Sequence, residues 1–235
     1  MTGRGAVLVT GSSRGIGAAV AERLTTGGFQ VVGWARSESI HCGRTSRVDV
    51  GYPEQVDRAV GETLADIPAL KGLVLNAGAG VWTALADLAV DEWRDTMRTN
   101  LDGAFHVLRA TLPRLIAGTG LIVGILSDSA RYPFPGRAAY GAAKSGLYAL
   151  LEAARREVRA AGVRVSLVVP SRVDTYFRGA HQESGPGTRP GALAAADVAG
   201  VVATLFDLPG EVEVRETHVA SVHATYGPYP EAVPV

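Results

Sequence analysis

The 235-residue sequence contains one cysteine, Cys42, and two lysines, Lys71 and Lys144. A single cysteine excludes an internal disulfide framework and any metal site built from several thiolates. Lysine plus arginine number 23, as do aspartate plus glutamate, so the formal net charge is zero. A balanced charge gives no excess of positive charge that would attract nucleic acid or an anionic membrane surface, so we expect neither as a partner.

Long apolar runs are also missing. No stretch of about 18 uncharged apolar residues occurs, so we expect no membrane-spanning helix. The first ten residues hold no apolar region of signal-peptide length, so we expect a cytoplasmic protein. The histidines show no metal-ligand spacing, so we expect no metal site. A chain rich in alanine, glycine and arginine but poor in lysine is typical of a GC-rich bacterial gene.

Short apolar runs alternate with helical patterns along the chain. We expect strands over 6–10, 30–34, 47–50, 72–76, 120–127, 163–169 and 212–219, and helices over 17–26, 53–66, 91–116, 139–161 and 195–207. This alternation predicts an α/β fold, with a parallel sheet covered by helices on both faces. No repeat or linker divides the chain, so we expect one domain over 1–235. The Gly- and Pro-rich stretch 176–192 is interpreted as a substrate lid.

A glycine-rich turn follows the first expected strand. It reads Thr10-Gly-Ser-Ser-Arg-Gly-Ile-Gly17 and leads directly into a helix. Glycines let the backbone approach a pyrophosphate, and the helix N-terminus supplies free N–H groups and a positive dipole. The turn therefore predicts a dinucleotide site formed by Gly11, Ser13, Arg14, Gly15, Ile16 and Gly17.

The end of the second strand bears on the choice between NADP and NAD. A carboxylate there would bind the adenosine ribose, but the sequence places Arg36 and Ser37 at this point. Arg36 offers a planar fork for a 2′-phosphate, and Arg14 offers a second cation. We therefore expect NADP(H) as cofactor, with NAD(H) as the alternative. In the alternative interpretation, Arg36 is an ordinary solvated loop residue.

Polar residues follow the third and fourth strands. Asp49 and Val50 come after the third strand, and Asn76-Ala77-Gly78 after the fourth. Ligands bind at the carboxyl edge of such a sheet. We expect Asp49 to accept from the adenine amino group and Asn76 to brace the strand ends.

Tyr140 and Lys144 are four residues apart on one expected helix and so share a face. A phenol with a pKa of about 10 is a poor acid or base at neutral pH. A neighbouring ammonium favours the phenolate and lowers that pKa. We therefore predict that Tyr140 exchanges a proton with a substrate oxygen.

A reacting carbonyl also needs a fixed hydrogen-bond donor. Ser127 ends the fifth expected strand, and Ser129 is the weaker candidate because it lies deeper in the loop. Asn100 stands in the middle of a long helix, where asparagine is a poor helix former. We expect it to bend that helix and to hold a water near Lys144, whereas the alternative is a packing asparagine satisfied by backbone.

These residues resemble the short-chain dehydrogenase/reductase family. The matching segments are the glycine turn, Asp49, Asn76-Ala-Gly78, Asn100, Ser127, Tyr140-Gly-Ala-Ala-Lys144 and Pro170-Ser-Arg-Val-Asp-Thr175, and they cover about 6–175. The resemblance implies a Rossmann-like, three-layer, doubly wound fold with a seven-stranded parallel sheet. It implies a catalytic tetrad of Asn100, Ser127, Tyr140 and Lys144.

The resemblance also assigns cofactor contacts to Tyr140 and Lys144, of which Lys144 would bind the nicotinamide ribose. In the segment that begins at Pro170, it implies that Thr175 and the backbone N–H of Val173 bind the carboxamide. Ser171 replaces the glycine that usually follows the proline. The family usually forms dimers or tetramers through its two long helices. The apolar stripe Ala142, Ala143, Leu147, Leu150, Leu151 and Ala154 fits either that interface or the core.

The sequence thus predicts an NADP(H)-dependent oxidoreductase that interconverts a ketone or aldehyde and an alcohol by hydride transfer. One alternative is an NAD-dependent alcohol dehydrogenase that runs in the oxidative direction. A second alternative is a non-catalytic NADP(H)-binding regulator, against which the complete tetrad argues. Trp82, Tyr132, Phe134, Tyr176 and Phe177 suggest a partly aromatic substrate pocket or, equally, core packing.

Overall fold

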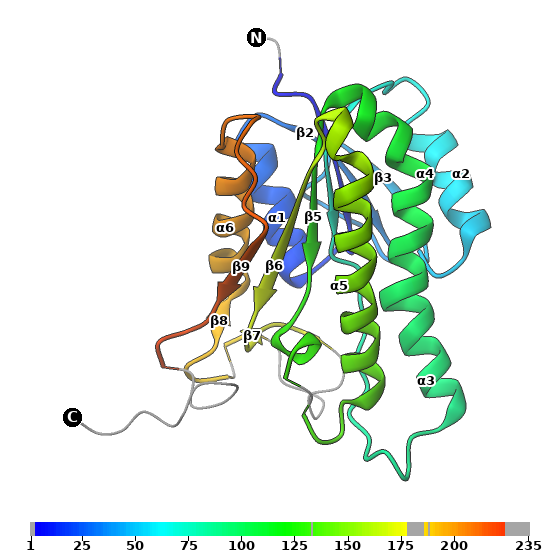
Figure 1. Ribbon diagram of the computed structural model, residues 1–235, viewed down its shortest axis with the longest axis vertical. Coiled ribbons are helices and arrows are strands. Elements are labelled where there is room, and N and C mark those ends of the chain that lie inside the picture. Colours follow the sequence, from blue (N-terminus) through cyan, green and yellow to red (C-terminus); the bar gives the residue numbers. More distant parts are fainter. Residues whose placement is uncertain (1–2, 133, 178–185, 188, 224–235) are drawn as a thin grey trace.

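The structure is a computed structural model that describes residues 3–132, 134–177, 186–187 and 189–223. Its central feature is a parallel seven-stranded sheet in the order β3-β2-β1-β4-β5-β6-β9, with helices on both faces (Figure 1). The strands are β1 Ala6–Thr10, β2 Gln30–Ala35, β3 Arg44–Arg47, β4 Leu70–Leu75, β5 Leu121–Ile125, β6 Arg164–Pro170 and β9 Glu216–Val219. The predicted Rossmann-like class and strand number are confirmed.

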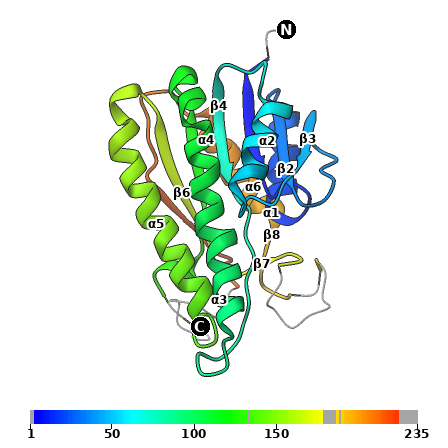
Figure 2. The ribbon, with the colours of Figure 1, turned by 90° about the vertical axis from the view of Figure 1, so that its right-hand side faces the viewer.

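The helices form two layers. They are α1 Gly15–Thr26, α2 Pro53–Thr63, α3 Val90–Met97, α4 Gly103–Gly118, α5 Ala138–Val158 and α6 Ala195–Asp207. Helices α1 and α6 cover one face, and α2, α4 and α5 cover the other (Figures 1 and 2). Short helical turns lie at η1 Arg98–Asp102, η2 Asp128–Ala130 and η3 Arg159–Ala161.

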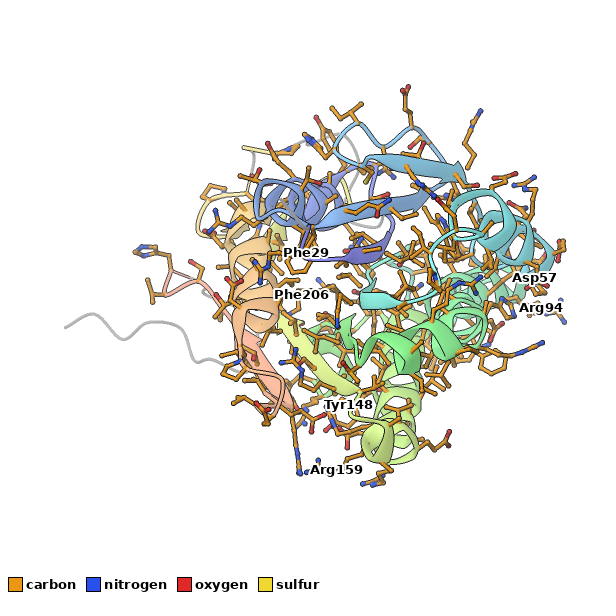
Figure 3. All side chains as sticks on the ribbon, turned by 90° about the horizontal axis from the view of Figure 1, so that it is seen from above. Phe29, Asp57, Arg94, Tyr148, Arg159 and Phe206 are labelled. Carbon is orange, nitrogen blue, oxygen red and sulfur yellow. The ribbon has the colours of Figure 1, made fainter. Side chains whose placement is uncertain are left out.

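Two hydrophobic clusters fill the space between the sheet and these layers. Central strands β1, β4 and β5 are buried along most of their length, as expected for strands covered on both faces. On the α1/α6 side, the rings of Phe29 and Phe206 meet edge to face with centroids 5.4 Å apart (Figure 3). On the α5 side, Ala143, Leu147, Leu151 and Ala154 of the predicted stripe are buried, so that part of the stripe belongs to the core.

The edge strands differ from the expected boundaries. The third strand was expected at 47–50 but covers Arg44–Arg47, and its burial is low. An edge strand pairs on one side only, so its residues need not be apolar, whereas Val48 and Val50 are buried after it ends. Similarly, the last strand pairs with β6 only over Glu216–Val219 rather than over 212–219.

The long helix expected over 91–116 is interrupted. A π-helical turn, η1, separates α3 from α4 and contains Asn100. The side chain of Asn100 donates to the carbonyl of Thr96 at 2.8 Å, within the same helical run. The helical run is therefore irregular at Asn100, and this side chain bonds to a backbone carbonyl within it.

The segment after β6 contains an additional two-stranded sheet, β7 Val173–Asp174 paired with β8 Leu193–Ala194. The expected lid, 176–192, lies between these strands, and residues 178–185 and 188 of it lie outside the described residues. Within the described ranges, no helix combines the length and apolar character needed to cross a membrane.

Candidate active site

A cavity of about 650 Å³ opens at the carboxyl ends of β1, β2, β4, β5 and β6. It lies at the point where the chain, having built β2 and β3 on one side of β1, crosses to β4 on the other side. Ligands of open α/β sheets bind at such a switch point. Nearly all the site residues expected from the sequence line this one cavity: Gly11, Ser13, Arg14, Gly15, Ile16, Arg36, Ser37, Asp49, Val50, Asn76, Ala77, Gly78, Ser127, Tyr140, Lys144, Pro170, Val173 and Thr175.

The glycine turn brings the N-terminus of α1 to the cavity. Gly11 and Gly15 have φ angles of 66° and 57°, a left-handed conformation that favours glycine. Gly17 does not line the cavity, because it packs inside the turn, where a Cβ atom would lie 2.2 Å from the carbonyl oxygen of Gly11. The turn therefore exposes backbone rather than side chains to a ligand, which fits a pyrophosphate.

Asn76 holds this turn against β4. Its side-chain nitrogen donates to the carbonyls of Thr10 and Gly11 at 2.9 and 3.2 Å. Its backbone N–H donates to the hydroxyl of Thr10 at 3.0 Å. The predicted bracing of the strand ends by Asn76 is confirmed.

The region beside β2 carries the charges expected for a phosphorylated ribose. Arg14, Arg36 and Ser37 are exposed and line the cavity. Asp49 lines it too, but one oxygen of its carboxylate accepts from the N–H of Gly51 at 3.0 Å and the other lies 3.7 Å from Arg98. The cavity lining therefore includes two exposed guanidinium groups, those of Arg14 and Arg36, and a guanidinium suits a phosphate.

Tyr140 and Lys144 face the cavity from the first turns of α5. The Nζ atom of Lys144 donates to the carbonyl of Ile125 at 2.8 Å and lies 5.8 Å from the centre of the Tyr140 ring. Lys144 is only 4% exposed. Burial lowers the pKa of Lys144 to about 8. The ammonium form still predominates at pH 7.

Aromatic rings surround Tyr140. The rings of Trp82 and Phe177 lie 5.3 and 5.5 Å from it, both edge to face. The guanidinium of Arg137 lies 4.4 Å above the Trp82 ring. Trp82, Phe177 and Tyr176 all line the cavity, so these three aromatic residues lie at the site rather than in the core.

Ser127 lies just beyond β5, at the N-terminus of η2. Its hydroxyl is 3.1 Å from a carboxylate oxygen of Asp128 and accepts from the backbone N–H of Ser129 at 3.2 Å. Ser127 and Asp128 line the cavity, whereas Ser129 is not among its lining residues. Ser127 is therefore the better placed of the two serines.

Asn100 is fully buried and is not among the residues that line the cavity. Its side-chain nitrogen donates to the carbonyl of Ala79 at 2.7 Å. A Cβ atom on Gly78 would lie 2.8 Å from its Oδ1 atom. Asn100 thus supports the cavity wall at Gly78 and Ala79 from behind.

The segment from Pro170 to Thr175 lines the cavity beside the glycine turn. Pro170, Val173 and Thr175 line it, and a Cβ atom on Gly15 would lie 3.5 Å from the Thr175 side chain. Ser171, which stands where the family usually has glycine, also lines the cavity. The substitution therefore leaves this segment in place beside the turn.

The sequence did not single out several lining residues, among them Asp128, Arg137 and Arg172, whereas Arg189 belongs to the expected lid. The only available signal for Asp128 was its position directly after Ser127. Arg172 precedes β7 and Arg189 precedes β8, and these two strands pair; Arg189 donates to the carbonyl of Val173 at 3.1 Å. Within the described ranges, no group of three or more His, Cys, Asp or Glu side chains could hold a metal ion.

Comparison with known proteins places this arrangement in a family. Residues 5–184 match the short chain dehydrogenase family. The chain is 30% identical to a 3-oxoacyl-(acyl-carrier-protein) reductase of Vibrio cholerae over 93% of this chain and 91% of that protein. It is 34% identical to the glycine betaine reductase ATRR of Emericella nidulans over 76% of this chain, but it spans only 15% of that protein.

A solved structure shares the fold closely. The alcohol dehydrogenase of the archaeon Thermococcus sibiricus, complexed with 5-hydroxy-NADP, superposes with a TM-score of 0.86 at 29% identity, covering 93% of this chain and 97% of that chain. The family match extends over more than half of the sequence and includes the glycine turn, Ser127, Tyr140 and Lys144. The protein therefore belongs to the short chain dehydrogenase family of oxidoreductases.

Proposed function

We propose that this protein is an NADP(H)-dependent oxidoreductase that interconverts a ketone or aldehyde and an alcohol. One observation carries the proposal: a phenol, an ammonium and a serine hydroxyl reach the same cavity as a glycine turn. Tyr140, Lys144 and Ser127 supply the first three groups. Such a site combines proton transfer with dinucleotide binding.

In this proposal, the cofactor lies along the carboxyl edge of the sheet. The glycine turn from Gly11 to Ile16 holds the pyrophosphate, and Asp49 with Val50 borders the adenine. Thr175 and the backbone N–H of Val173 bind the carboxamide, and the wall from Asn76 to Gly78 completes the site. When bound, the nicotinamide ring supplies or accepts the hydride.

The cofactor is proposed to be NADP(H) rather than NAD(H). Arg36 directly follows β2, where a carboxylate would favour an unphosphorylated ribose, and Arg14 directly precedes α1; both line the cavity. Glu38 is near in sequence but is not among the lining residues. The likeness to a structure solved with 5-hydroxy-NADP supports the same choice.

The proton transfer is assigned to Tyr140. In the reductive direction its phenol gives a proton to the substrate oxygen, and Ser127 donates a hydrogen bond to the same oxygen. Lys144 stabilises the resulting phenolate through its charge and binds the ribose hydroxyls. Asn100 acts from behind the wall by holding Ala79 and a water near Lys144.

The substrate is proposed to contact the aromatic side of the cavity. Trp82, Phe177 and Tyr176 offer apolar faces beside Tyr140, and Arg137 places a cation over Trp82. Arg189, in the described part of the expected lid, also lines the cavity. These groups favour a substrate with an apolar portion next to its carbonyl.

A homodimer or homotetramer is proposed through α4 and α5. The outer face of α5 exposes small side chains, Ala142, Ser145, Ala149 and Ala153, and Phe105 on α4 is 45% exposed. Small residues allow close helix packing between copies. Ala149→Arg is expected to reduce the molar mass measured by light scattering, and an unchanged mass would contradict this interface.

The deciding experiment is a panel of aldehydes and ketones with NADPH consumption as readout. We expect turnover of at least one class, and faster turnover with NADPH than with NADH. Tight NADPH binding without turnover across the whole panel would contradict the proposal and favour a binding regulator. Faster turnover of alcohols with NAD would instead favour the oxidative alternative.

A further inference from the structure

The hydroxyl of Ser127 has one proton to donate and two lone pairs to accept with. The backbone N–H of Ser129 already donates to it at 3.2 Å. A carboxyl oxygen of Asp128, Oδ1, lies 3.1 Å from the same Oγ atom. Only one proton can lie between these two oxygens. Whether that proton is bonded to Ser127 or to Asp128 decides whether Ser127 can still donate a hydrogen bond to a ligand.

Two protonation states of Asp128 have opposite consequences. If Asp128 is ionised, the proton between the oxygens must come from Ser127, which then has no proton left for a substrate oxygen. If Asp128 is a neutral carboxylic acid, Asp128 donates to Oγ, and both lone pairs of Ser127 are used. The Ser127 proton is then available to the cavity.

The surroundings of Asp128 favour the neutral acid. The residue is 6% exposed, and its second oxygen, Oδ2, is buried with no hydrogen-bond partner among the described residues. An unpartnered buried charge costs far more than an unpartnered carbonyl oxygen. Burial raises the pKa of Asp128, although Arg137 before α5 and His218 on β9 oppose the rise, as do hydrogen bonds from Ser127 and the N–H of Ser129.

We propose that Asp128 is a positioning residue that works as a neutral carboxylic acid, donating to Oγ of Ser127 and so turning the Ser127 proton towards the substrate carbonyl. A carboxylic acid kept neutral by its surroundings can serve in this way at a reacting oxygen. The inference rests on the proposed function, because it takes Ser127 as the group that holds the substrate oxygen.

The test is the pH profile of kcat/KM for carbonyl reduction with NADPH. The wild-type value is expected to fall about tenfold per pH unit once Asp128 ionises. Asp128→Asn and Asp128→Ala cannot ionise, so both are expected to lack that fall and to keep only the decline due to Tyr140 and Lys144. Asp128→Asn should stay nearer the wild-type plateau than Asp128→Ala, because an amide can also donate to Oγ.

Two controls separate this effect from general damage. Asp91→Asn removes an exposed carboxylate of α3 and is expected to keep the wild-type profile. Infrared spectra of the wild type minus Asp128→Asn should contain the C=O band of a carboxylic acid, and this band should disappear at the pH where kcat/KM falls. The infrared readout does not depend on turnover.

The outcomes distinguish the two proposals. Reductase activity with the same profile in wild type and Asp128→Asn overturns the role of Asp128 and leaves the proposed function standing. Absence of the carboxylic-acid band at pH values where the enzyme is active also overturns it. A wild type that reduces no carbonyl overturns both, whatever the band shows.

Discussion

The ammonium of Lys144 lies 5.8 Å from the ring centre of Tyr140, and both groups reach one cavity from the same face of α5. The carbonyl of Ile125, at the end of β5, accepts from Nζ at 2.8 Å and holds it there. A cation placed so close stabilises the phenolate of Tyr140 relative to the phenol. Helix and sheet edge together therefore bring a phenol and an ammonium to the same cavity.

Tyr140→Phe removes only the hydroxyl and keeps the ring contacts with Trp82 and Phe177. We expect kcat to fall by about 10²–10⁴, the usual contribution of a positioned acid or base, while NADPH binding changes little. The measurements are initial rates of NADPH consumption and a fluorescence titration. Tyr52→Phe, which alters an exposed tyrosine outside the cavity, is the matched control. Wild-type turnover in Tyr140→Phe would refute the role assigned to this phenol.

Arg36→Glu reverses the charge at the end of β2. Loss of a charge-assisted phosphate contact is worth about 1.5–3 kcal/mol, so the Kd for NADPH should rise by roughly one to two orders of magnitude. The affinity for NADH should rise, because a carboxylate now faces the ribose hydroxyls. Arg23→Glu, an exposed charge reversal in the last turn of α1 and outside the cavity lining, is the control. Unchanged discrimination between NADPH and NADH would show that Arg36 does not bind the phosphate.

The lowered pKa of Lys144 makes the free energy of unfolding depend on pH, and it sets the sign of that dependence. Burial lowers this pKa to about 8, whereas an unfolded lysine titrates near about 10.4. The unfolded chain binds more protons between these values, so the wild type gains up to about 3 kcal/mol of stability as pH rises through this window. Below this pH window, the buried ammonium of Lys144 lowers the stability of the folded protein.

The free energy of unfolding of Lys144→Met is therefore expected to fall relative to that of the wild type as pH increases from 8 to 10.5. The measurement is the free energy of unfolding in urea at several pH values without cofactor. Lys71→Met, which removes the other lysine and its bond to the carbonyl of Gly118, is the control. A constant stability difference between Lys144→Met and wild type across this range would contradict the lowered pKa.

Glu216 connects the loop after β5 to two other elements. It accepts from Arg131 at 2.6 Å, from His218 at 2.6 Å and from the hydroxyl of Tyr148 on α5 at 3.3 Å (Figure 3 labels Tyr148). Because Arg131 directly follows η2, this network anchors the segment that carries Ser127. The charged contacts are partly exposed, so each contributes modestly.

Glu216→Gln should lower kcat by about tenfold or less and leave the Kd for NADPH unchanged, because it loosens the Ser127 segment and not the glycine turn. Glu157→Gln, at an exposed position of α5, should match the wild type. If Glu216→Gln changes only the melting temperature and not kcat, the network stabilises the fold without positioning Ser127.

The central strands and the site motifs could be predicted because their residues carry a local signature. Strands buried on both faces must be apolar along their length, and β1, β4 and β5 are. The edge strand β3 has no such requirement and therefore accommodates Arg44 and Arg47. Because it lacks an apolar signature, its boundaries were predicted wrongly. The interruption at Asn100 was predictable because asparagine competes with the helical backbone.

The neighbours of the site could not be predicted in the same way. Arg137 gave no local signal, and Arg172 and Arg189, which line the same cavity, come from the segments before β7 and β8, which pair although they are distant in sequence. For Asp128, the sequence shows that the residue follows Ser127, but it does not show that the side chain is buried. The unpartnered oxygen and the raised pKa both arise from burial against other elements.

The sequence by itself determined the parallel sheet, the glycine turn and the Tyr140–Lys144 pair, since each follows from residue order within one or two adjacent elements. The tertiary structure alone decided that Lys144 is buried, that Trp82 and Phe177 pack against Tyr140, and that Asp128 is buried beside the hydroxyl of Ser127. The physical reason is that pKa values and ring contacts depend on which distant segments exclude water from a group, and local sequence order does not specify those segments.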